Sequence, residues 1–338
     1  MGDYRREISV NLASGEKGMS GEIRFGFVGT GGVATLHAEA MRRLDNARLV
    51  GAWSPTPEHV ATFANAHAIK PYRSLDELLD DDGVEAVAVL TSAESHADLA
   101  LKCLEAGKHV LVEKPLASSL EQIGKLKAAA GGRFCMPSHN YVYDPRLREA
   151  KQRLEASDFG RLASVWMIYN QKHWRDWGSP DVLIRELMIH HAYVAIYFAG
   201  QPRAVSCTAS NVFFSNTTFP DQAMAVVEHD GGVISNLWGS FGVDDFTSSP
   251  WTVFYKILGL DGGFQMSWND SQFGSAKFPG WDKAAYRDSF YYVQEYFVNE
   301  CLGKVRAPLS TMDDAAAALR LTEAMLESVK RGAKGALG

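Results

Sequence analysis

The sequence is poor in cysteine, nearly balanced in charge and without a long apolar run. Its 338 residues include four cysteines, none in a Cys-x-x-Cys pair, which excludes a disulfide framework and a cysteine zinc site. We expect reduced, buried thiols and no bound metal. The formal net charge of −6 gives no electrostatic reason to bind nucleic acid or an anionic membrane. No apolar run approaches the roughly 20 residues of a membrane-spanning helix.

The beginning of the chain also lacks the features of a secretory leader. Residues 1–21 are dominated by glycine, serine and charge, with neither an apolar core nor a cleavage signal. Such a composition cannot bury much apolar surface, so we expect a disordered extension. Met19 stands just before the first expected strand. Together with the scattered thiols, this predicts a cytoplasmic protein.

Two kinds of pattern divide the rest of the chain. Over residues 22–140, apolar runs alternate with amphipathic stretches, which predicts an α/β domain with a parallel, doubly wound sheet. Strand-like runs then follow one another with few helices between them, which predicts an α+β domain with a mostly antiparallel sheet. The strands expected there are 162–170, 203–213, 222–229, 232–241 and 251–258, and the helices are 146–157, 181–199, 283–302 and 312–331. We place the two domains at 22–143 and 144–338.

A glycine turn follows the first apolar run. The run Ile23–Val28 leads directly into Gly29-Thr30-Gly31-Gly32-Val33-Ala34, and a helical pattern covers residues 33–44. The order of strand, Gly-x-Gly-x-x-Ala and helix points backbone N–H groups at a pyrophosphate, which predicts dinucleotide binding through these six residues. A glycine turn that serves only tight packing is the alternative.

The second expected strand, 48–53, ends at the position that selects between the two nicotinamide cofactors. Ser54 stands where an acid would bind the ribose 2′-hydroxyl of NAD. Thr56 and His59 follow at the start of the next helix, and residues 49–69 contain no lysine or arginine to hold the 2′-phosphate of NADP. We therefore expect use of both NAD and NADP, with a modest preference for NAD.

A third signal is the apolar run Val110–Val112, which ends in Glu113-Lys114-Pro115. This pattern is typical of a buried parallel strand that delivers charged side chains to the carboxyl edge of a sheet. Pro115 biases Lys114 towards an extended backbone, so the lysine does not enter a following helix. Taken alone, Lys114 is more simply a solvated lysine at a strand end.

A histidine and a carboxylate share one face of the helix expected at 181–199. Glu186 and His190 are four residues apart, which places their side chains about 40° apart, whereas His191 is rotated by about a further 100°. A carboxylate beside a histidine fixes its tautomer and favours its charged form, as general acid–base catalysis requires. A surface ion pair is the alternative, but the neighbouring residues are strongly apolar and indicate burial.

Together these features resemble the Gfo/Idh/MocA family of oxidoreductases. The resemblance rests on the Gly-x-Gly-x-x-Ala turn, the loop from Thr91 to His96, the segment AGKHVLVEKPL at 106–116 and the acid-x-x-x-His pair. It implies an N-terminal Rossmann domain, an open antiparallel sheet behind it and a substrate site between the two. It also implies homo-oligomers, dimers or tetramers, formed through the open sheet face. In such a protein Lys114 and His190 are catalytic, and Thr91, His96, Glu113 and Lys114 contact the cofactor.

The chain departs from the family pattern at two positions besides Ser54. Glu186 stands where relatives carry aspartate, which lengthens the side chain by about 1.5 Å. Val142 replaces an arginine in the connector that runs from His139 to Pro145, so an anionic substrate contact is lost. Trp166, in an expected strand, suits both ring stacking and core packing. We expect the substrate to contact the connector, two loop tryptophans and the catalytic residues: Lys114, His139, Asn140, Tyr141, Trp174, Trp177, Glu186 and His190.

The expected activity is hydride transfer between nicotinamide C4 and a secondary hydroxyl or ketone of a sugar, glycoside or cyclitol. In the oxidation direction His190 accepts the hydroxyl proton, Glu186 supports the imidazolium, and the Lys114 ammonium stabilises alkoxide-like charge. Two alternatives stay open. One is a hydrolase or lyase that uses tightly held NAD for transient oxidation, and the other is a non-catalytic nucleotide-sensing module.

Overall fold

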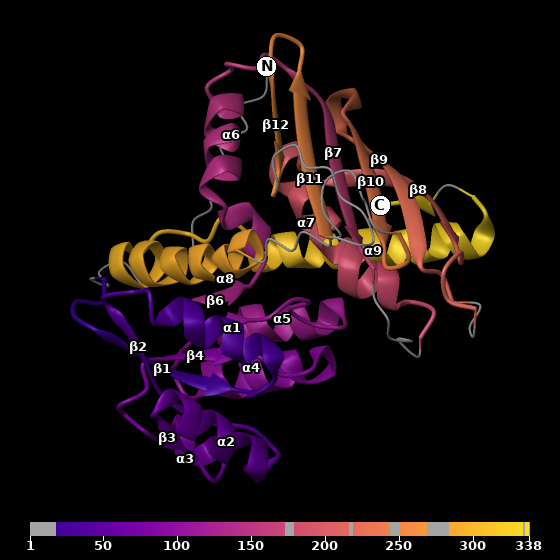
Figure 1. Ribbon diagram of the computed structural model, residues 1–338. Helices are drawn as coiled ribbons and strands as arrows, with labels where there is room; N and C mark the ends of the chain where they lie inside the picture. The colour runs from indigo at the N-terminus through magenta and orange to yellow at the C-terminus, as the bar shows by residue number, and fades with distance from the viewer. Residues whose placement is uncertain are drawn as a thin grey trace. The chain divides into compact units, whose positions relative to one another are not determined.

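The computed structural model describes residues 18–172, 179–215, 219–243, 251–268, 284–333 and 335–337. These residues form two compact units, which are described separately below (Figure 1). The first unit ends at Ser138 and regains the later segment Phe290–Met312. The second unit contains His139–Ser289 and the chain from Asp313 onwards. The division after Ser138 lies five residues from the predicted boundary at 143, but the return of 290–312 to the first unit differs from the prediction.

The first unit contains a six-stranded parallel sheet in the order β3-β2-β1-β4-β5-β6. This is the order of a Rossmann fold, and it confirms the predicted doubly wound sheet. The strands are β1 (Ile23–Val28), β2 (Ala47–Trp53), β3 (Lys70–Pro71), β4 (Ala86–Val89), β5 (His109–Val112) and β6 (Cys135–Pro137). The helices before the return segment are α1 (Gly32–Met41), α2 (Pro57–His67), α3 (Leu75–Leu79), α4 (His96–Glu105) and α5 (Leu120–Ala129).

The local sequence explains where these elements begin and end. Every residue of β4 and β5 is buried, as expected of short apolar strands covered on both faces. Pro57 occupies the first turn of α2, where its missing N–H costs nothing. Ser119 and Gln122 form a reciprocal capping box at the start of α5. The positions of these strands and helices in the first unit therefore follow from their local sequence.

The return segment joins the first unit through aromatic and polar contacts. It comprises the end of α8 (Ala284–Tyr296), a π-helical turn (Phe297–Leu302) and the chain up to Met312. The ring of Phe297 lies edge-on to Phe25 of β1 at 6.2 Å, and Phe290 lies edge-on to His37 of α1 at 5.0 Å. Met19 donates a backbone hydrogen bond of 2.9 Å to the carbonyl of Leu302. Burial of these apolar side chains explains why this segment belongs to the first unit. Residues 1–17 of the predicted extension lie outside the described range.

The second unit contains a seven-stranded sheet in the order β12-β11-β7-β10-β9-β8-β13. Its strand pairs are antiparallel except for β7 with β10, which confirms the predicted mostly antiparallel sheet. The strands are β7 (Leu162–Gln171), β8 (Pro202–Ser210), β9 (Gln222–His229), β10 (Ile234–Ser240), β11 (Trp251–Gly259), β12 (Gly263–Ser267) and β13 (Gly335–Ala336). The helices are α6 (Pro145–Glu155), α7 (Met188–Ala199) and α9 (Met312–Arg331).

The segment that carries His190 is less regular than predicted. It begins with a π-helical turn at Leu183–Leu187 and becomes α-helical only at Met188. The wider π turn changes the angular spacing across Glu186, so the 40° separation expected from a regular α-helix does not apply. α7 lies close against β10 at Gly239, where an added Cβ would stand 3.0 Å from Cγ of Met188 and 3.2 Å from Cδ2 of Leu187. None of the helices in the described ranges is long and apolar enough to cross a bilayer.

Candidate active site

The glycine turn between β1 and α1 has the geometry that a dinucleotide requires. Gly29 has a φ of +110°, and a Cβ there would lie 2.6 Å from the carbonyl oxygen of Leu90, so only glycine fits. Gly31 and Gly32 are exposed, and a Cβ on either would meet no described atom within 4 Å. Ala34 is fully buried, which lets α1 approach the sheet closely. The turn therefore leaves open space in front of the first N–H groups of α1, where a pyrophosphate fits.

The ribose-selecting position lies directly beside this turn. Gly29 N–H donates to the carbonyl of Trp53, the last residue of β2, at 2.8 Å. Ser54 follows, half-buried, and its Oγ accepts a long hydrogen bond of 3.4 Å from the N–H of Thr56. His59 is exposed in the first turn of α2. The structure thus brings the turn, Ser54 and Thr56 together, while their contacts with cofactor remain a prediction.

His96 ties together the loops that follow β4 and β5. The ring is 2% exposed, with Nδ1 at 2.8 Å from the carbonyl oxygen of Pro115 and Nε2 at 3.0 Å from that of Thr91. Ser95 reinforces the loop, because its hydroxyl donates to the carbonyl of Ser92 at 2.9 Å and lies 2.7 Å from Oγ1 of Thr91. This loop is therefore fixed to the segment that carries Lys114.

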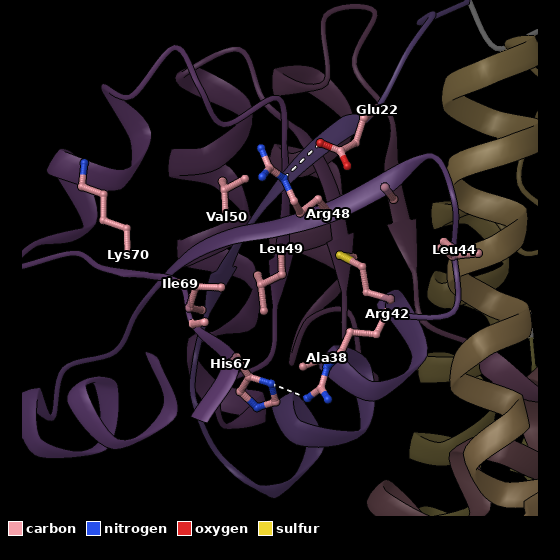
Figure 2. Close-up of a pocket in the computed structure, with 13 residues that line it drawn as sticks. Glu22, Ala38, Arg42, Leu44, Arg48, Leu49, Val50, His67, Ile69 and Lys70 are labelled. Atoms are coloured by element: carbon pink, nitrogen blue, oxygen red, sulfur yellow. Dashed lines mark hydrogen bonds and ion pairs between the residues drawn. The ribbon is translucent and has the colours of Figure 1, made fainter. Parts of the chain in front are cut away.

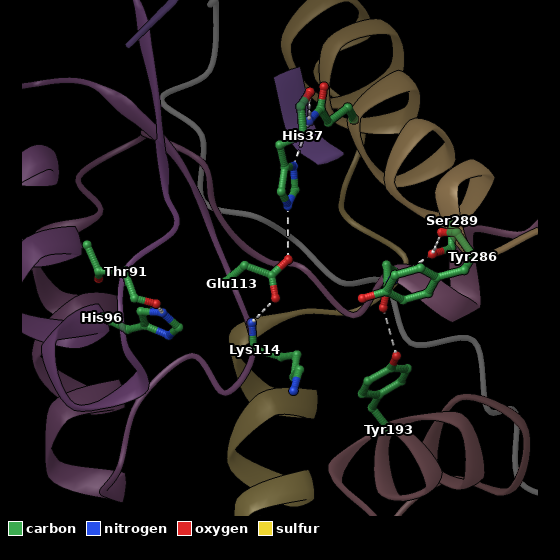
Figure 3. A network of polar contacts seen from close by, with 10 residues as sticks. His37, Thr91, His96, Glu113, Lys114, Tyr193, Tyr286 and Ser289 are labelled. Carbon is green, nitrogen blue, oxygen red and sulfur yellow. Dashed lines mark hydrogen bonds and ion pairs between the residues drawn. The ribbon is translucent and has the colours of Figure 1, made fainter. Parts of the chain in front are cut away.

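Glu113 lies in a buried polar network that the sequence did not reveal. Its Oε1 lies 3.0 Å from Nε2 of His37, and its Oε2 accepts from the N–H of Lys114 at 3.1 Å (Figure 3). The amide nitrogen of Gln294 donates both to the carbonyl of His37 at 3.0 Å and to Nδ1 of the same ring at 2.6 Å. Because a carbonyl only accepts, this orientation of Gln294 makes Nδ1 an acceptor and places the His37 proton on Nε2, facing Glu113.

The electrostatics of Glu113 follow from these contacts. Burial alone would raise the pKa of its carboxyl group, but the hydrogen bond from His37 and the positive charge of Lys114 prevail and lower it. Glu113 is therefore an ionised anchor for the backbone of Lys114. It is 9% exposed, so the structure assigns it a supporting place beside the lysine, and its predicted cofactor contact remains a prediction.

The parallel sheet brings the first unit's site residues to one edge. Gly29, Ser54, Thr91 and Lys114 all lie within two residues of the last residue of β1, β2, β4 or β5. Ligands of open α/β sheets bind at this carboxyl edge. The side chain of Lys114 is half-buried there. The predicted placement of the lysine at this edge is confirmed, and its catalytic role remains a prediction.

A different hollow in the first unit contains none of the predicted site residues. It measures about 530 Å³ and is lined by the beginning of β2, the end of α1 and the residues around His67 (Figure 2). Its charged side chains are already engaged, since Arg42 lies 2.6 Å from Nδ1 of His67 and Arg48 pairs with Glu22 at 3.0 Å. Because it adjoins the start of β2 rather than its end, we do not assign the cofactor to this hollow.

In the second unit, His190 is held by two tyrosines. The imidazole is 7% exposed, and its Nδ1 lies 2.6 Å from the hydroxyl oxygen of Tyr193, one turn further along α7. The ring of Tyr141 stacks on it, with centroids 4.4 Å apart and planes inclined by 20°. Tyr193 was missed in the sequence, where its position three residues after His190 was the available signal. The supporting role predicted for Glu186, which is half-buried in the π turn, remains a prediction.

The connector residues predicted to bind substrate contact His190 or its partner Tyr193. His139, Asn140 and Tyr141 are between 1% and 4% exposed. The ring of His139 stacks on Tyr193 at 4.3 Å, and Asn140 accepts from the hydroxyl of Tyr193 at 3.1 Å. These contacts support the histidine, so direct contact with substrate remains a prediction. Trp174 and Trp177 lie outside the described residues.

His191 differs from His190 as the helical pattern predicted. It is fully buried, and its Nε2 lies 2.8 Å from the carbonyl oxygen of Trp238 in β10. Burial lowers the pKa of His191 to about 4, despite the opposing hydrogen bond with the backbone of Trp238. It is therefore a neutral structural histidine. Among the described residues, no group of histidine, cysteine and carboxylate side chains could hold a metal ion.

Comparisons with known proteins identify the family of both units. Residues 23–141 match the model of an oxidoreductase family with an NAD-binding Rossmann fold, and residues 147–265 match the Gfo/Idh/MocA C-terminal domain. The chain is 25% identical to scyllo-inositol 2-dehydrogenase (NAD(+)) of Bacillus subtilis (strain 168) over 93% of this chain and 96% of that protein.

Two solved structures share the fold at lower identity. A myo-inositol dehydrogenase from Corynebacterium glutamicum ATCC 13032 has a TM-score of 0.80 and 20% identity, covering 94% of this chain and 99% of that one. GenD2 from gentamicin A biosynthesis, solved in complex with NAD, has a TM-score of 0.80 and 23% identity, covering 96% and 99%. With both domain models matched in order, the chain belongs to the Gfo/Idh/MocA family of NAD-binding oxidoreductases.

Proposed function

We propose that this oxidoreductase transfers hydride between nicotinamide C4 and a secondary hydroxyl or ketone of a sugar, glycoside or cyclitol. The observation that carries the proposal is the arrangement of His190, a buried imidazole whose orientation is fixed by a hydrogen bond at Nδ1 and by the ring of Tyr141. General acid–base catalysis on a hydroxyl group is most often carried out by such an oriented histidine. The relative that spans nearly the whole chain, an inositol dehydrogenase, supports a polyhydroxylated substrate.

The residues of this chain divide the work between proton transfer and charge stabilisation. When bound, the nicotinamide supplies the hydride acceptor or donor. In the oxidation direction, His190 accepts the proton of the substrate hydroxyl, and hydride leaves the carbon that bears this hydroxyl for nicotinamide C4. The ammonium of Lys114 stabilises the negative charge that develops on the oxygen. Glu113 and His37 hold the backbone of Lys114, and Glu186 supports the imidazolium.

The cofactor is NAD or NADP, with a slight preference for NAD. Ser54 offers neither the carboxylate that favours NAD nor a cation for the 2′-phosphate of NADP. The NAD complex of GenD2 and the similarity to scyllo-inositol 2-dehydrogenase (NAD(+)) of Bacillus subtilis support the preference for NAD.

A substrate panel tests the proposal. Sugars, inositols and glycosides would be mixed with each cofactor, and formation of the reduced nicotinamide would be followed by absorbance. We expect turnover with at least one polyol, and its loss in the variant His190→Asn. Cofactor that copurifies and cycles without net reduction would favour transient oxidation by a hydrolase or lyase. Binding of cofactor without turnover of any compound would favour a sensing module.

We also propose that the protein forms a homo-oligomer through the exposed face of the second sheet. Trp166 in β7 is 42% exposed, and Val226 in β9 is 43% exposed. Both pair in register with Asn236 of the intervening strand β10, so the two apolar side chains flank one position. Met224, 55% exposed, extends this apolar surface along β9. The variant Trp166→Glu should lower the mass measured by light scattering, whereas an unchanged mass would rule out this face.

A further inference from the structure

A chain of four hydrogen bonds runs behind His190, and we propose that it sets which ring nitrogen carries the proton. The chain begins at the carbonyl of Tyr286, passes through Ser289, Asn140 and Tyr193, and ends at Nδ1 of His190. Figure 3 shows Tyr286, Ser289 and Tyr193. It makes Tyr193, Asn140 and Ser289 positioning residues. Its meaning for catalysis rests on the proposed function of His190 as the base.

The polarity of the chain is fixed at its far end. The carbonyl oxygen of Tyr286 can only accept, so the Ser289 hydroxyl donates to it at 2.7 Å. A hydroxyl has a single hydrogen, and therefore the second partner of Ser289 must itself be a donor. That partner is Nδ2 of Asn140, at 2.7 Å from Oγ. The amide of Asn140 is thereby oriented with its oxygen away from Ser289.

The remaining two bonds follow from this orientation. The amide oxygen of Asn140 can only accept, so the hydroxyl of Tyr193 donates to it at 3.1 Å. With its hydrogen committed, the Tyr193 oxygen must accept at 2.6 Å from Nδ1 of His190. The backbone N–H of Tyr141 points to the same oxygen at 3.5 Å, which agrees with its role as an acceptor. His190 is therefore the Nδ1–H tautomer, and Nε2 holds the lone pair that accepts a proton.

Burial makes this polarity difficult to bypass. Tyr193 is 1% exposed, and Asn140 and Ser289 are each 4% exposed. Water cannot readily replace a missing partner at such positions, so each group depends on its neighbour in the chain. His139 holds the ring of Tyr193 by stacking on it at 4.3 Å.

The opposite direction of these hydrogen bonds would move the proton of neutral His190 to the other ring nitrogen. If the amide of Asn140 were reversed, Ser289 would lose its bond to Tyr286, and Tyr193 would donate to Nδ1. The proton of a neutral His190 would then lie on Nε2, and this nitrogen could not accept a proton from substrate. Once Nε2 does accept a proton, the Nδ1–H bond to Tyr193 becomes charge-assisted and shorter. Uncharged hydrogen-bonding groups thus orient the imidazole of His190 at Nδ1, a position where many catalytic histidines have a carboxylate.

Nitrogen-15 NMR of the full-length protein tests the tautomer without reference to activity. The histidines would be labelled with nitrogen-15, and the signals of His190 would be assigned by their loss in His190→Asn. In the wild type we expect a protonated Nδ1 and an unprotonated Nε2 while the ring is neutral. The variants Tyr193→Phe and Ser289→Ala should convert this pattern to a mixture of tautomers, and Ser289→Thr, which keeps the hydroxyl, should restore it.

A matched control separates this effect from a loss of stability. Ser328 is also buried, 2% exposed, and accepts from the N–H of Cys207 at 2.9 Å. We expect Ser328→Ala to lower the melting temperature without changing the tautomer. With an active substrate, Ser289→Ala should lower kcat about tenfold with little change in KM, and Ser289→Thr should recover it.

The failures of the two proposals are distinguishable. A proton on Nε2 in the wild type, or the same tautomer in Tyr193→Phe and Ser289→Ala, would overturn the hydrogen-bond chain. If the expected tautomer is found but His190→Asn keeps full turnover, the chain stands and the proposed base does not.

Discussion

Glu113 and His37 are 76 residues apart in the chain and are joined by a buried hydrogen bond of 3.0 Å. The bond fixes the carboxylate that holds the N–H of Lys114, and Gln294 holds the ring of His37 from the other side. The backbone of Lys114 is thus held by a hydrogen-bond network that joins three segments of the first unit, namely α1, the chain after β5 and the end of α8. Four predictions concern this network, the ribose-selecting Ser54 and the two adjacent histidines of α7.

Glu113→Gln should destabilise the protein most near neutral pH. The pKa of Glu113 lies below its ordinary value of 4.5, so the folded state favours the ionised form. That contribution to the free energy of unfolding is present above pH 4.5 and is lost as the pH falls through the folded-state pKa. Urea denaturation of both proteins at several pH values measures it. A difference that stays constant down to acidic pH would contradict an ionised Glu113.

Lys114→Ala should lower kcat by about 10²- to 10³-fold, because the ammonium acts on charge that develops only in the transition state. Cofactor affinity, measured by quenching of protein fluorescence, should change little. Lys102→Ala, on the exposed side of α4, is the matched control and should keep full activity. An effect of Lys114→Ala confined to cofactor affinity would argue against its role on the substrate oxygen.

The two adjacent histidines should differ in what their loss affects. His190→Ala should lower kcat by about 10²- to 10⁴-fold, as expected for loss of a general base. His191→Ala should act on stability instead. Since the folded-state pKa of His191 is about 4, the unfolded chain binds a proton that the folded one refuses, and stability falls as the pH drops from 6.5 to 4.

The linked free energy at His191 amounts to roughly 3 kcal/mol. Urea titrations should show this loss in the wild type and a smaller one in His191→Ala. Equal losses of turnover in the two folded variants would contradict the separate roles given to the two histidines.

Ser54→Asp should weaken binding of NADPH and leave binding of NADH nearly unchanged. A carboxylate there would repel the 2′-phosphate and accept hydrogen bonds from the ribose hydroxyls. Fluorescence titration of wild type and variant with both cofactors measures the four dissociation constants. A wild type that binds NADPH a hundredfold more tightly than NADH would mean that a cation from elsewhere reaches the phosphate.

The parts of the fold that depend on local pattern could be predicted from the sequence. The run from Ile23 to Ala34 combines apolar composition, glycine spacing and helical periodicity within a few residues, and all three agree with the structure. β9 alternates buried and exposed residues strictly, which is why its predicted bounds match. The position of Lys114 just after a strand could be predicted because the proline and the end of the apolar run are both visible in the sequence.

The hydrogen-bonded support of the site could not be predicted, because its partners are distant in sequence. Asn140 and Ser289 are 149 residues apart, and Gln294 and His37 are 257 residues apart. No periodicity links such pairs, and only the folded packing brings them together. The π turn before α7 likewise has no signature in composition, since its residues read as an ordinary apolar helix.

Gly239 has a consequence for anyone who alters this protein. Its missing side chain sets the depth at which α7 rests on β10, since a methyl group there would meet Met188 at 3.0 Å and the ring of His191 at 3.4 Å. A side chain at position 239 would require Met188 to shift by a few tenths of an ångström, so altered turnover in such a variant would report on packing and not on chemistry. The glycine acts as a spacer, because it lets α7, the helix that carries His190, pack closely on β10.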